Sequence, residues 1–558
     1  MDWSMFDGDP EVIRLSASLF DRRDTDCRDF AAIKARPRMW PKHSERRRYA
    51  PWEDFPLGRV MAVLDAVEFD GDDLDEALDK TLSGGQSTVH PGVAEWVRHA
   101  CVTYIDVADS FTGVRPVRSP RIVQGRSSVA QFRAMTAWGR WYESEDGARV
   151  EFRRLRMGRP FGAPDQLSTM AMAFVAGFGR PAKSHRDLYT SIPVPVVNEH
   201  PLPQRIRVIE VGLTTGTDKV LVDSSPAEIR HEYKIAVPPA AARLLSGGHR
   251  APGQDCADCK ARVSCDSLPV APGLLGLDDR GTHRRTWSIT TSRYYEVCPA
   301  QAHLRDVRLP SEWNSSDAVQ RGRDVHRWLE IAHLRGVPCT EADLPADCAE
   351  ELMSQDAYRQ ARPYLLQHLK VCPLRGPGVL TEIRPEPKIA AYDPAADVVV
   401  LANPDLLRRV NGRLVYREQK TSAAPAGITA ENALSVVPQL ALAVCLISAG
   451  VFGEADGLVE LEQLHPDSAE PVLEFDIAKP EIVAAARAII HQRARAWHGD
   501  ITFRASPGWW CRSCPVSRWC SSAVTDGDAA FDPATGEIRT AAIADLIAEP
   551  EIDDEPPF

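Results

Sequence analysis

The segment Val398-Val-Val-Leu-Ala-Asn-Pro-Asp405 decides the fold together with the segment Arg413-Leu-Val-Tyr-Arg-Glu418-Gln-Lys420. Both are rich in apolar and β-branched residues, which predicts two strands, the first running toward Asp405. Asn411-Gly412 between them is a strong signal for a tight hairpin. The hairpin would bring Asp405 and Glu418 to one end of a sheet, with Lys420 on the same strand face as Glu418.

Two carboxylates and a lysine in this arrangement suit the hydrolysis of a phosphodiester. Hard oxygen ligands hold Mg²⁺ or Mn²⁺, and such an ion polarises the phosphate and lowers the pKa of bound water. A nearby ammonium orients that water or offsets the developing charge. Acidic and basic residues also alternate on many solvated strands, so the pattern gains weight only from the segments around it.

Those segments predict two helices. Gly322-Arg-Asp-Val-His326-Arg-Trp-Leu-Glu330 has the apolar periodicity of an amphipathic helix, and His326 lies next to its buried stripe. A lone histidine in that position is usually a packed residue. Pro438-Gln439-Leu-Ala-Leu-Ala-Val-Cys-Leu follows the Lys420 strand and predicts a second helix, with proline suited to its first turn.

The spacing Cys-x2-Cys-x5-Cys occurs twice, and each triplet has an upstream cysteine in a similar setting. The two sets are Cys27, Cys256, Cys259 and Cys265, and Cys298, Cys511, Cys514 and Cys520. The repeat indicates a duplicated module closed by four-cysteine clasps. Disulfides are the alternative, but no signal peptide or apolar span opens the chain, so we expect a reducing cytoplasm, where clustered cysteines usually hold metal. We expect the remaining cysteines to be ordinary packed or surface residues: Cys101, Cys339, Cys348, Cys372 and Cys445.

Taken together, these residues resemble the RecB-like branch of the PD-(D/E)XK nucleases, above all members with an iron-sulfur clasp, such as the nuclease module of AddB and the RecB-like exonucleases of CRISPR adaptation. The resemblance covers about Ser288 to Cys520. It implies that His326, Asp405 and Glu418 are ligands of Mg²⁺ or Mn²⁺, that Lys420 is the catalytic lysine and that Gln439 organises the site. The resemblance also assigns Glu382 to the site, and Glu386 lies close to it in the sequence. Asn403-Pro404 and Ala443 depart from the family pattern, which puts substrate handling in doubt more than metal binding.

The same resemblance implies a 4Fe-4S cluster on Cys298, Cys511, Cys514 and Cys520, which ligation by four thiolates permits. Tetrahedral Zn²⁺ would use the same four ligands. Cys27, Cys256, Cys259 and Cys265 would hold a second iron-sulfur cluster or zinc. In either case we expect the clasp to be structural, because it ties together residues far apart in the chain.

The first half keeps the pattern of the second but not its acidic residues. Aligning the halves sets Ala94 against His326, and the turn at Asp146-Gly147 then sets Arg140 opposite Asp405 and Arg153 opposite Glu418. Leu155 stands opposite Lys420. Two arginines would repel a divalent ion, so we predict an inactive copy. The arginines would either contact backbone phosphate or form salt bridges.

The last residues form an acidic tail. The net charge of the chain is -12, but residues 525–558 contain ten acidic residues and one arginine, so the rest is nearly balanced. Local basic runs, such as 36–48 and 115–121, form either a phosphate track or a solvated surface. The tip resembles that of bacterial single-stranded-DNA-binding proteins, which implies binding of a partner protein through Asp553, Asp554, Glu555, Pro556, Pro557 and Phe558. The tail would recruit such partners, fold back on a basic channel, or merely solubilise the chain.

The expected fold is α/β, with two tandem PD-(D/E)XK domains, each a mixed sheet flanked by helices. We expect an inactive domain at 1–275, an active one at 276–524 and a disordered tail at 525–558. The expected function is metal-dependent cleavage of DNA, from an end or on single strands, in repair, recombination or mobile-element biology. The alternative is a non-catalytic scaffold that binds DNA and partners. No Gly-x4-Gly-Lys-Ser/Thr motif occurs, so any unwinding would need a helicase partner; no membrane partner is expected.

Overall fold

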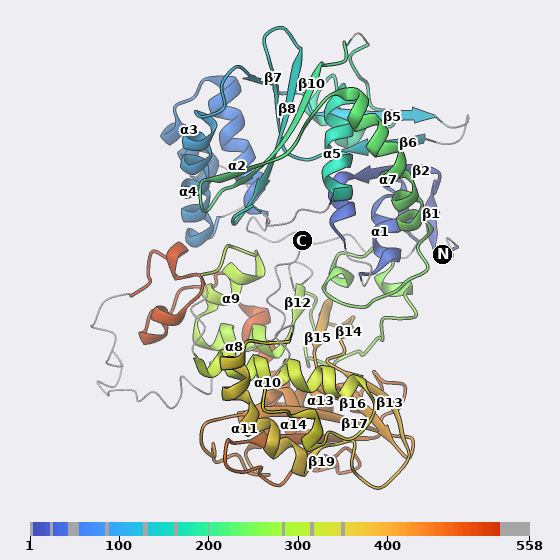
Figure 1. Ribbon diagram of the computed structural model, residues 1–558, viewed down its shortest axis with the longest axis vertical. Helices are drawn as coiled ribbons and strands as arrows, with labels where there is room; N and C mark the ends of the chain where they lie inside the picture. Colours follow the sequence, from blue (N-terminus) through green and yellow to red (C-terminus); the bar gives the residue numbers. More distant parts are fainter. Residues whose placement is uncertain are drawn as a thin grey trace.

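The computed structural model describes residues 4–22, 26–42, 55–83, 89–126, 132–160, 166–198, 200–281, 285–312, 317–347 and 352–524. It has a mixed α/β architecture in which several mixed sheets are flanked by helices (Figure 1). The predicted acidic tail with its tip, Cys348 and part of the basic run 36–48 lie outside these residues. Within the described part of the chain, no helix is long and apolar enough to cross a membrane.

The second half is built on a five-stranded sheet of order β13-β16-β17-β18-β19. Its strands are Leu380–Pro385, Leu406–Val410, Arg413–Thr421, Gly457–Leu464 and Leu473–Asp476. β16 and β17 form an antiparallel hairpin, and Asn411 and Gly412 at its turn have φ angles of 51° and 85°. Both angles lie in the left-handed region that a tight type I′ turn requires. The hairpin predicted from Asn-Gly is therefore confirmed.

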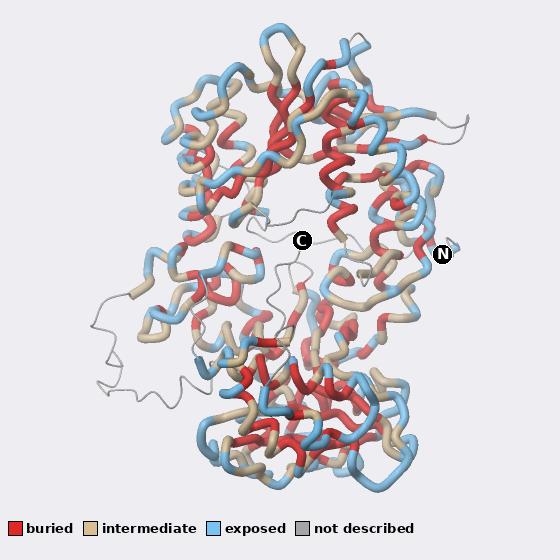
Figure 2. The backbone as a smooth tube through the Cα atoms, viewed as in Figure 1, coloured by how far each residue is buried: buried red, intermediate tan, exposed pale blue. Residues whose placement is uncertain are grey.

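One face of this sheet carries an apolar core. β17 and β18 are parallel, so they need a crossover connection, which α12 (Ala433–Val436) and α13 (Pro438–Ser448) supply. α13 is buried along almost its whole length and packs against α14 (Pro480–Gly499). Figure 2 shows in red the buried segments of this half of the molecule. A small sheet of β12 (Arg285–Trp287), β15 (Val398–Ala402) and β14 (Ile389–Asp393) extends the same core.

The opposite face is covered by α10 (Asp317–Leu334) and α11 (Gln355–Val371). Val325 and Leu329 of α10 share a core with Tyr358 and Leu365 of α11 and with Leu464 of β18. Because side chains alternate along a strand, Glu418 and Lys420 of β17 face the α13 side of the sheet. Gln419, between them, points to the opposite face and donates to Glu462, which also contacts His368 of α11.

The first half repeats this strand order with the same pairing directions. Its main sheet runs β4-β7-β8-β10-β11, at Arg115–Pro116, Arg140–Glu143, Arg149–Arg156, Arg205–Gly212 and Thr217–Ser224. β7 and β8 form an antiparallel hairpin, and β8 and β10 are parallel, with α5 (Gln166–Phe178) between them in the chain. A second sheet contains β2 (Val12–Ser16), β6 (Phe132–Thr136), β5 (Arg121–Arg126) and β9 (Arg180–Pro181). A two-stranded sheet of β1 (Phe6–Gly8) and β3 (Met39–Pro41) lies near the start of the chain.

Helices complete the first half and lead into the second. They are α1 (Arg28–Lys34), α2 (Pro56–Asp65), α3 (Leu74–Ser83), α4 (Pro91–Ala108), α6 (His185–Thr190), α7 (Pro226–Ser246), α8 (Ile289–Val297) and α9 (Pro299–Asp306). The chain enters the core of the second half at Ala271, Leu274, Leu275 and Leu277. This entry lies beside the predicted boundary at 275/276.

Each cysteine-rich segment packs against the other half of the molecule. Val516 and Trp519 lie between Cys514 and Cys520 and share a core with Val93 and Trp96 of α4. Conversely, Cys256, Ala257 and Leu268 pack against β14 and β15 through Ala390, Tyr392 and Val399. The two halves are therefore joined by two reciprocal contacts, at segments that the alignment of the halves makes equivalent.

Candidate active site

The residues singled out by sequence meet in one pocket at the end of the β16–β17 hairpin. Asp405 directly precedes β16, while Glu418 and Lys420 lie on β17. The ladder pairs Leu406 with Arg417, so Asp405 and Glu418 are the next residues along the two strands. The pocket brings together all five residues predicted for the catalytic centre: His326, Asp405, Glu418, Lys420 and Gln439.

The centre of the pocket is a group of ligand atoms from His326, Glu386 and Asp405 that all lie within 4.8 Å of one another. His326 Nδ1 lies 2.8 Å from Asp405 Oδ1 and 3.7 Å from Glu386 Oε1. Nδ1 is buried and forms an ion pair with the carboxylate of Asp405. A buried nitrogen aimed between two carboxylates matches the donor set of a divalent metal site.

Burial raises the pKa of two carboxyl groups in the pocket. The pKa of Glu418 lies well above its usual range, because burial disfavours the charged form and the charge of Asp405 adds to this. Burial likewise raises the pKa of Glu386 to about 7. The pKa of Asp405 is lowered although burial opposes the shift, because the charge of His326 stabilises its carboxylate. Three acids crowded in this way favour the binding of a proton or a cation.

Lys420 and Gln439 occupy the walls of the pocket. Lys420 Nζ lies 3.9 Å from Glu418 Oε2, and its charge also helps to lower the pKa of Asp405. Gln439, at the first turn of α13, accepts a hydrogen bond over 3.0 Å from Arg293 Nη2. Arg293 lies on α8 and also lines the pocket, but no local pattern in the sequence marks it. The pocket therefore has a cationic side that could face a phosphate.

Glu386, and not Glu382, reaches the pocket. Glu382 is exposed and pairs with Arg409 Nε at 2.7 Å, on the outside of the sheet. Glu386 is partly buried, accepts a hydrogen bond from Asn403 Nδ2 over 3.1 Å and lines the pocket. The register of β13 against β16 shifts between Thr381 and Arg384, and this irregularity decides which glutamate faces His326. The resemblance pointed to Glu382, but the glutamate that lines the pocket is Glu386.

The two sets of four cysteines each gather in space. Burial raises the pKa of Cys514 to about 12, and the charges of Cys298, Cys511 and Cys520 add to it. Burial raises that of Cys259 to about 12 in the same way, with Cys27, Cys256 and Cys265 as the charged neighbours. The cysteines of both sets are free thiols. Backbone N–H groups donate to the sulfur of Cys298 from Ser506 over 3.3 Å and to that of Cys511 from Gly508 over 3.4 Å.

The matching position in the first half contains buried ion pairs. Arg140 and Arg153 are directly paired across β7 and β8, where Asp405 and Glu418 meet in the second half. Their exposed fractions are 3% and 1%. Arg140 pairs with Glu68 and with Asp65, and Arg153 donates to Glu151 over 2.7 Å. Of the two alternatives, salt bridges rather than phosphate contacts match this arrangement.

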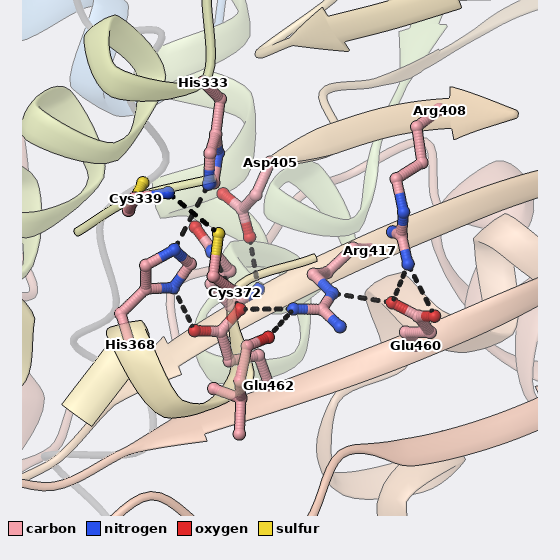
Figure 3. A network of polar contacts seen from close by, with 11 residues as sticks. His333, Cys339, His368, Cys372, Asp405, Arg408, Arg417, Glu460 and Glu462 are labelled. Carbon is pink, nitrogen blue, oxygen red and sulfur yellow. Dashed lines mark hydrogen bonds and ion pairs between the residues drawn. The ribbon is translucent and has the colours of Figure 1, made fainter. Parts of the chain in front are cut away.

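A second group of potential metal ligands was missed by the sequence analysis. Cys339 and Cys372, expected to be ordinary packed residues, lie beside His333 and His368 in the core (Figure 3). One ligand atom from each of the four lies within 4.8 Å of the others. The His-x3-Cys spacing of His368 and Cys372 was the one local signal, because it puts both side chains on one side of a helix end.

Comparison with known proteins identifies the second half. Residues 286–521 match the family model of the PD-(D/E)XK nuclease superfamily. No curated protein matches the chain. Among solved structures, one titled "Crystal structure of SSO0001" is similar, with 18% identity, 42% of this chain and 98% of that chain covered, and a TM-score of 0.19. The family match covers the hairpin, the pocket and the last three cysteines, and residues 286–521 therefore form a PD-(D/E)XK nuclease superfamily domain.

Proposed function

We propose that the second half of the chain is a DNA nuclease of the RecB-like type, which hydrolyses phosphodiester bonds with Mg²⁺ or Mn²⁺. The observation that carries this proposal is the group of His326, Glu386 and Asp405, whose ligand atoms all lie within 4.8 Å of one another. When bound there, the divalent ion would polarise the phosphate and lower the pKa of a water molecule.

The residues of the chain have distinct roles in this proposal. His326, Asp405 and Glu418 hold the ion, and Glu386 completes its carboxylate ligands. Lys420 orients the attacking water or offsets the charge that develops on the phosphate. Arg293 holds the side-chain oxygen of Gln439 over 3.0 Å, which leaves the amide nitrogen of Gln439 for the substrate or for water.

Cleavage of end-labelled DNA tests this proposal. We expect Asp405→Asn and Lys420→Ala to abolish Mn²⁺-dependent cleavage of single- and double-stranded substrates while leaving iron content and melting temperature unchanged. Glu382→Gln serves as the matched control, because Glu382 is exposed and pairs with Arg409 outside the pocket. Cleavage by the Asp405→Asn protein at the wild-type rate would refute the assignment and favour the scaffold function.

We further propose that each set of four cysteines holds a 4Fe-4S cluster. Among the described residues, neither set forms a group of ligand atoms all within 4.8 Å, although their charges act on one another. Four thiolates can hold either a tetrahedral zinc ion or a 4Fe-4S cluster, and the resemblance to nucleases with an iron-sulfur clasp favours the cluster. Anaerobic purification should yield about eight irons per chain, and iron-free protein with zinc in both sets would overturn this.

The first half is proposed to be an inactive copy of the second. The equal strand order, the equivalent hairpins and the presence of Arg140 and Arg153 opposite each other support this proposal. The copy lends structural support, since its core includes Trp519 from the second half. An exonuclease or single-strand role in DNA repair, recombination or mobile-element biology follows from the resemblance, with DNA as the substrate and a helicase as a possible partner.

The acidic tip, Asp553 to Phe558, is proposed to recruit proteins that recognise the tips of single-stranded-DNA-binding proteins. An aromatic residue that follows a run of acidic residues suits an apolar pocket with a basic rim. Deleting the last six residues should abolish capture of such a partner without changing cleavage. Increased cleavage by the truncated protein alone would instead indicate that the tail folds back on the nuclease.

A further inference from the structure

Four potential metal ligands lie together in the core between α10, α11 and the sheet (Figure 3). His333 is in the last turn of α10, Cys339 follows in the next loop, His368 is in the last turn of α11 and Cys372 is at its C-cap. Their exposed fractions are 1%, 0%, 0% and 5%. The group is separate from the catalytic pocket and from both four-cysteine sets.

A neighbouring glutamate determines how His368 faces the group. Its Nδ1 lies 2.5 Å from Oε1 of Glu462, and an ionised carboxylate only accepts hydrogen bonds, so Nδ1 carries the proton. Its Nε2 lies 3.2 Å from Nε2 of His333, so a metal ion between the two rings would take both nitrogens as ligands. A carboxylate on the outer nitrogen of a ligating histidine is the usual arrangement around zinc. On the sulfur side, the Cys339 N–H donates to Cys372 Sγ over 3.4 Å.

We propose that His333, Cys339, His368 and Cys372 bind one Zn²⁺ in a closed tetrahedral site. Two thiolates and two imidazoles are a regular zinc ligand set and a poor one for Mg²⁺ or Ca²⁺. Zinc bonds of about 2.0–2.3 Å need neighbouring ligand atoms about 3.4–3.8 Å apart, which small side-chain movements would achieve here. Since all four ligands are buried, no open position remains for substrate, and the site is structural.

The proposed site is connected to the catalytic pocket by a short chain of hydrogen bonds, drawn in Figure 3. Besides His368, Glu462 accepts hydrogen bonds from Arg417 Nη1 and from Gln419 Nε2, each over 2.9 Å. The backbone N–H of Gln419 in turn donates to the carboxylate of Asp405. Zinc binding would thereby hold β17 in position beneath the pocket.

The site also anchors the helix that carries His326. His333 follows His326 by seven residues on α10, which is two turns or about 10 Å along the helix. The ligands from α10 and α11 would be tied to each other at the ends of the two helices. The four zinc ligands are thus positioning residues for the pocket, and none of them is catalytic.

Metal analysis of the full-length protein tests this inference independently of nuclease activity. We expect zinc X-ray absorption of the wild-type protein, purified after growth with added zinc, to give a shell of two sulfur and two nitrogen atoms. The double variant Cys339→Ala/Cys372→Ala should lose one zinc per chain and keep its iron. Cys445→Ala is the matched control, because Cys445 is equally buried in α13 and lies outside every ligand group among the described residues.

Several outcomes would overturn the inference. One is a zinc shell of sulfur alone, which would place any zinc in the four-cysteine sets. Others are a folded wild-type protein that takes up no Zn²⁺ when titrated, a Cys339–Cys372 disulfide found by mass spectrometry, and iron in place of zinc at the site. The absorption shell comes from the wild-type protein, so the test holds even if the double variant fails to fold.

Discussion

Replacing Glu386 with glutamine should show that Glu386, and not the nearby Glu382, belongs to the catalytic pocket. Glu386 Oε1 lies 3.7 Å from the nitrogen of His326 and belongs to the proposed ligand group, whereas Glu382 is exposed and bound to Arg409. A unit charge at about 4 Å contributes ~4 kcal/mol at an effective dielectric constant of about 20. The net loss is smaller than this interaction energy, because the glutamine amide still attracts the ion through its dipole and costs less to desolvate than a carboxylate.

We therefore expect Glu386→Gln to weaken the binding of Mn²⁺ by ~2–3 kcal/mol, a factor of roughly 30 to 160. The assay is the rate of cleavage of end-labelled DNA as a function of Mn²⁺ concentration, with direct Mn²⁺ titration as the second measurement. Glu382→Gln should leave both within about twofold, as expected for exposed ion pairs. Equal Mn²⁺ dependence in the two variants, or a larger defect in Glu382→Gln, would refute the assignment of Glu386 to the pocket.

Three further outcomes follow from the packing and charges. In chelator-treated protein, the pKa of Glu386 is raised to about 7, so the folded state holds a proton that the unfolded state has released. Stability should therefore fall as pH rises from about 4.5 to 7, by up to ~3 kcal/mol, and the difference between wild-type and Glu386→Gln protein in urea unfolding isolates this contribution. An equal pH dependence in both would contradict it. Arg140→Met in the first half removes the cationic partner of the partly buried Glu68, which keeps only its hydrogen bond from Tyr142, and should lower stability by up to about 3 kcal/mol in thermal unfolding. Arg118→Ala, an exposed partner of Asp70, should change it by less than about 1 kcal/mol. Trp519→Ala should cost about 3–5 kcal/mol and, because Trp519 packs on α4, increase hydrogen exchange in the first half; an effect confined to the second half would rule out the reciprocal packing.

Much of the catalytic pocket was predictable because its pattern is local. Asn411-Gly412 specifies the turn, and strand alternation then puts Glu418 and Lys420 on one face opposite Asp405. The same counting from Asp146-Gly147 aligned Arg140 with Asp405 and Arg153 with Glu418, and the structure pairs the two arginines across β7 and β8. His326 and Gln439 came from resemblance, and the structure brings both to the pocket.

Other features depended on contacts that no local pattern encodes. The irregular register of β13 decides that Glu386 faces His326. The sequence pattern alone does not distinguish Glu386 from Glu382. Arg293 reaches Gln439 only because α8 packs beside α13.

The amino-acid order of this chain was sufficient for the hairpin, the acidic pair and the two cysteine triplets, because strand alternation, turn geometry and short cysteine spacings act over a few residues. Tertiary packing alone brings His333 and Cys339 to His368 and Cys372, since α10 and α11 must first bury their apolar faces against the sheet. It also sets each cysteine segment against the opposite half, through contacts of apolar side chains that carry no directional signal in the sequence.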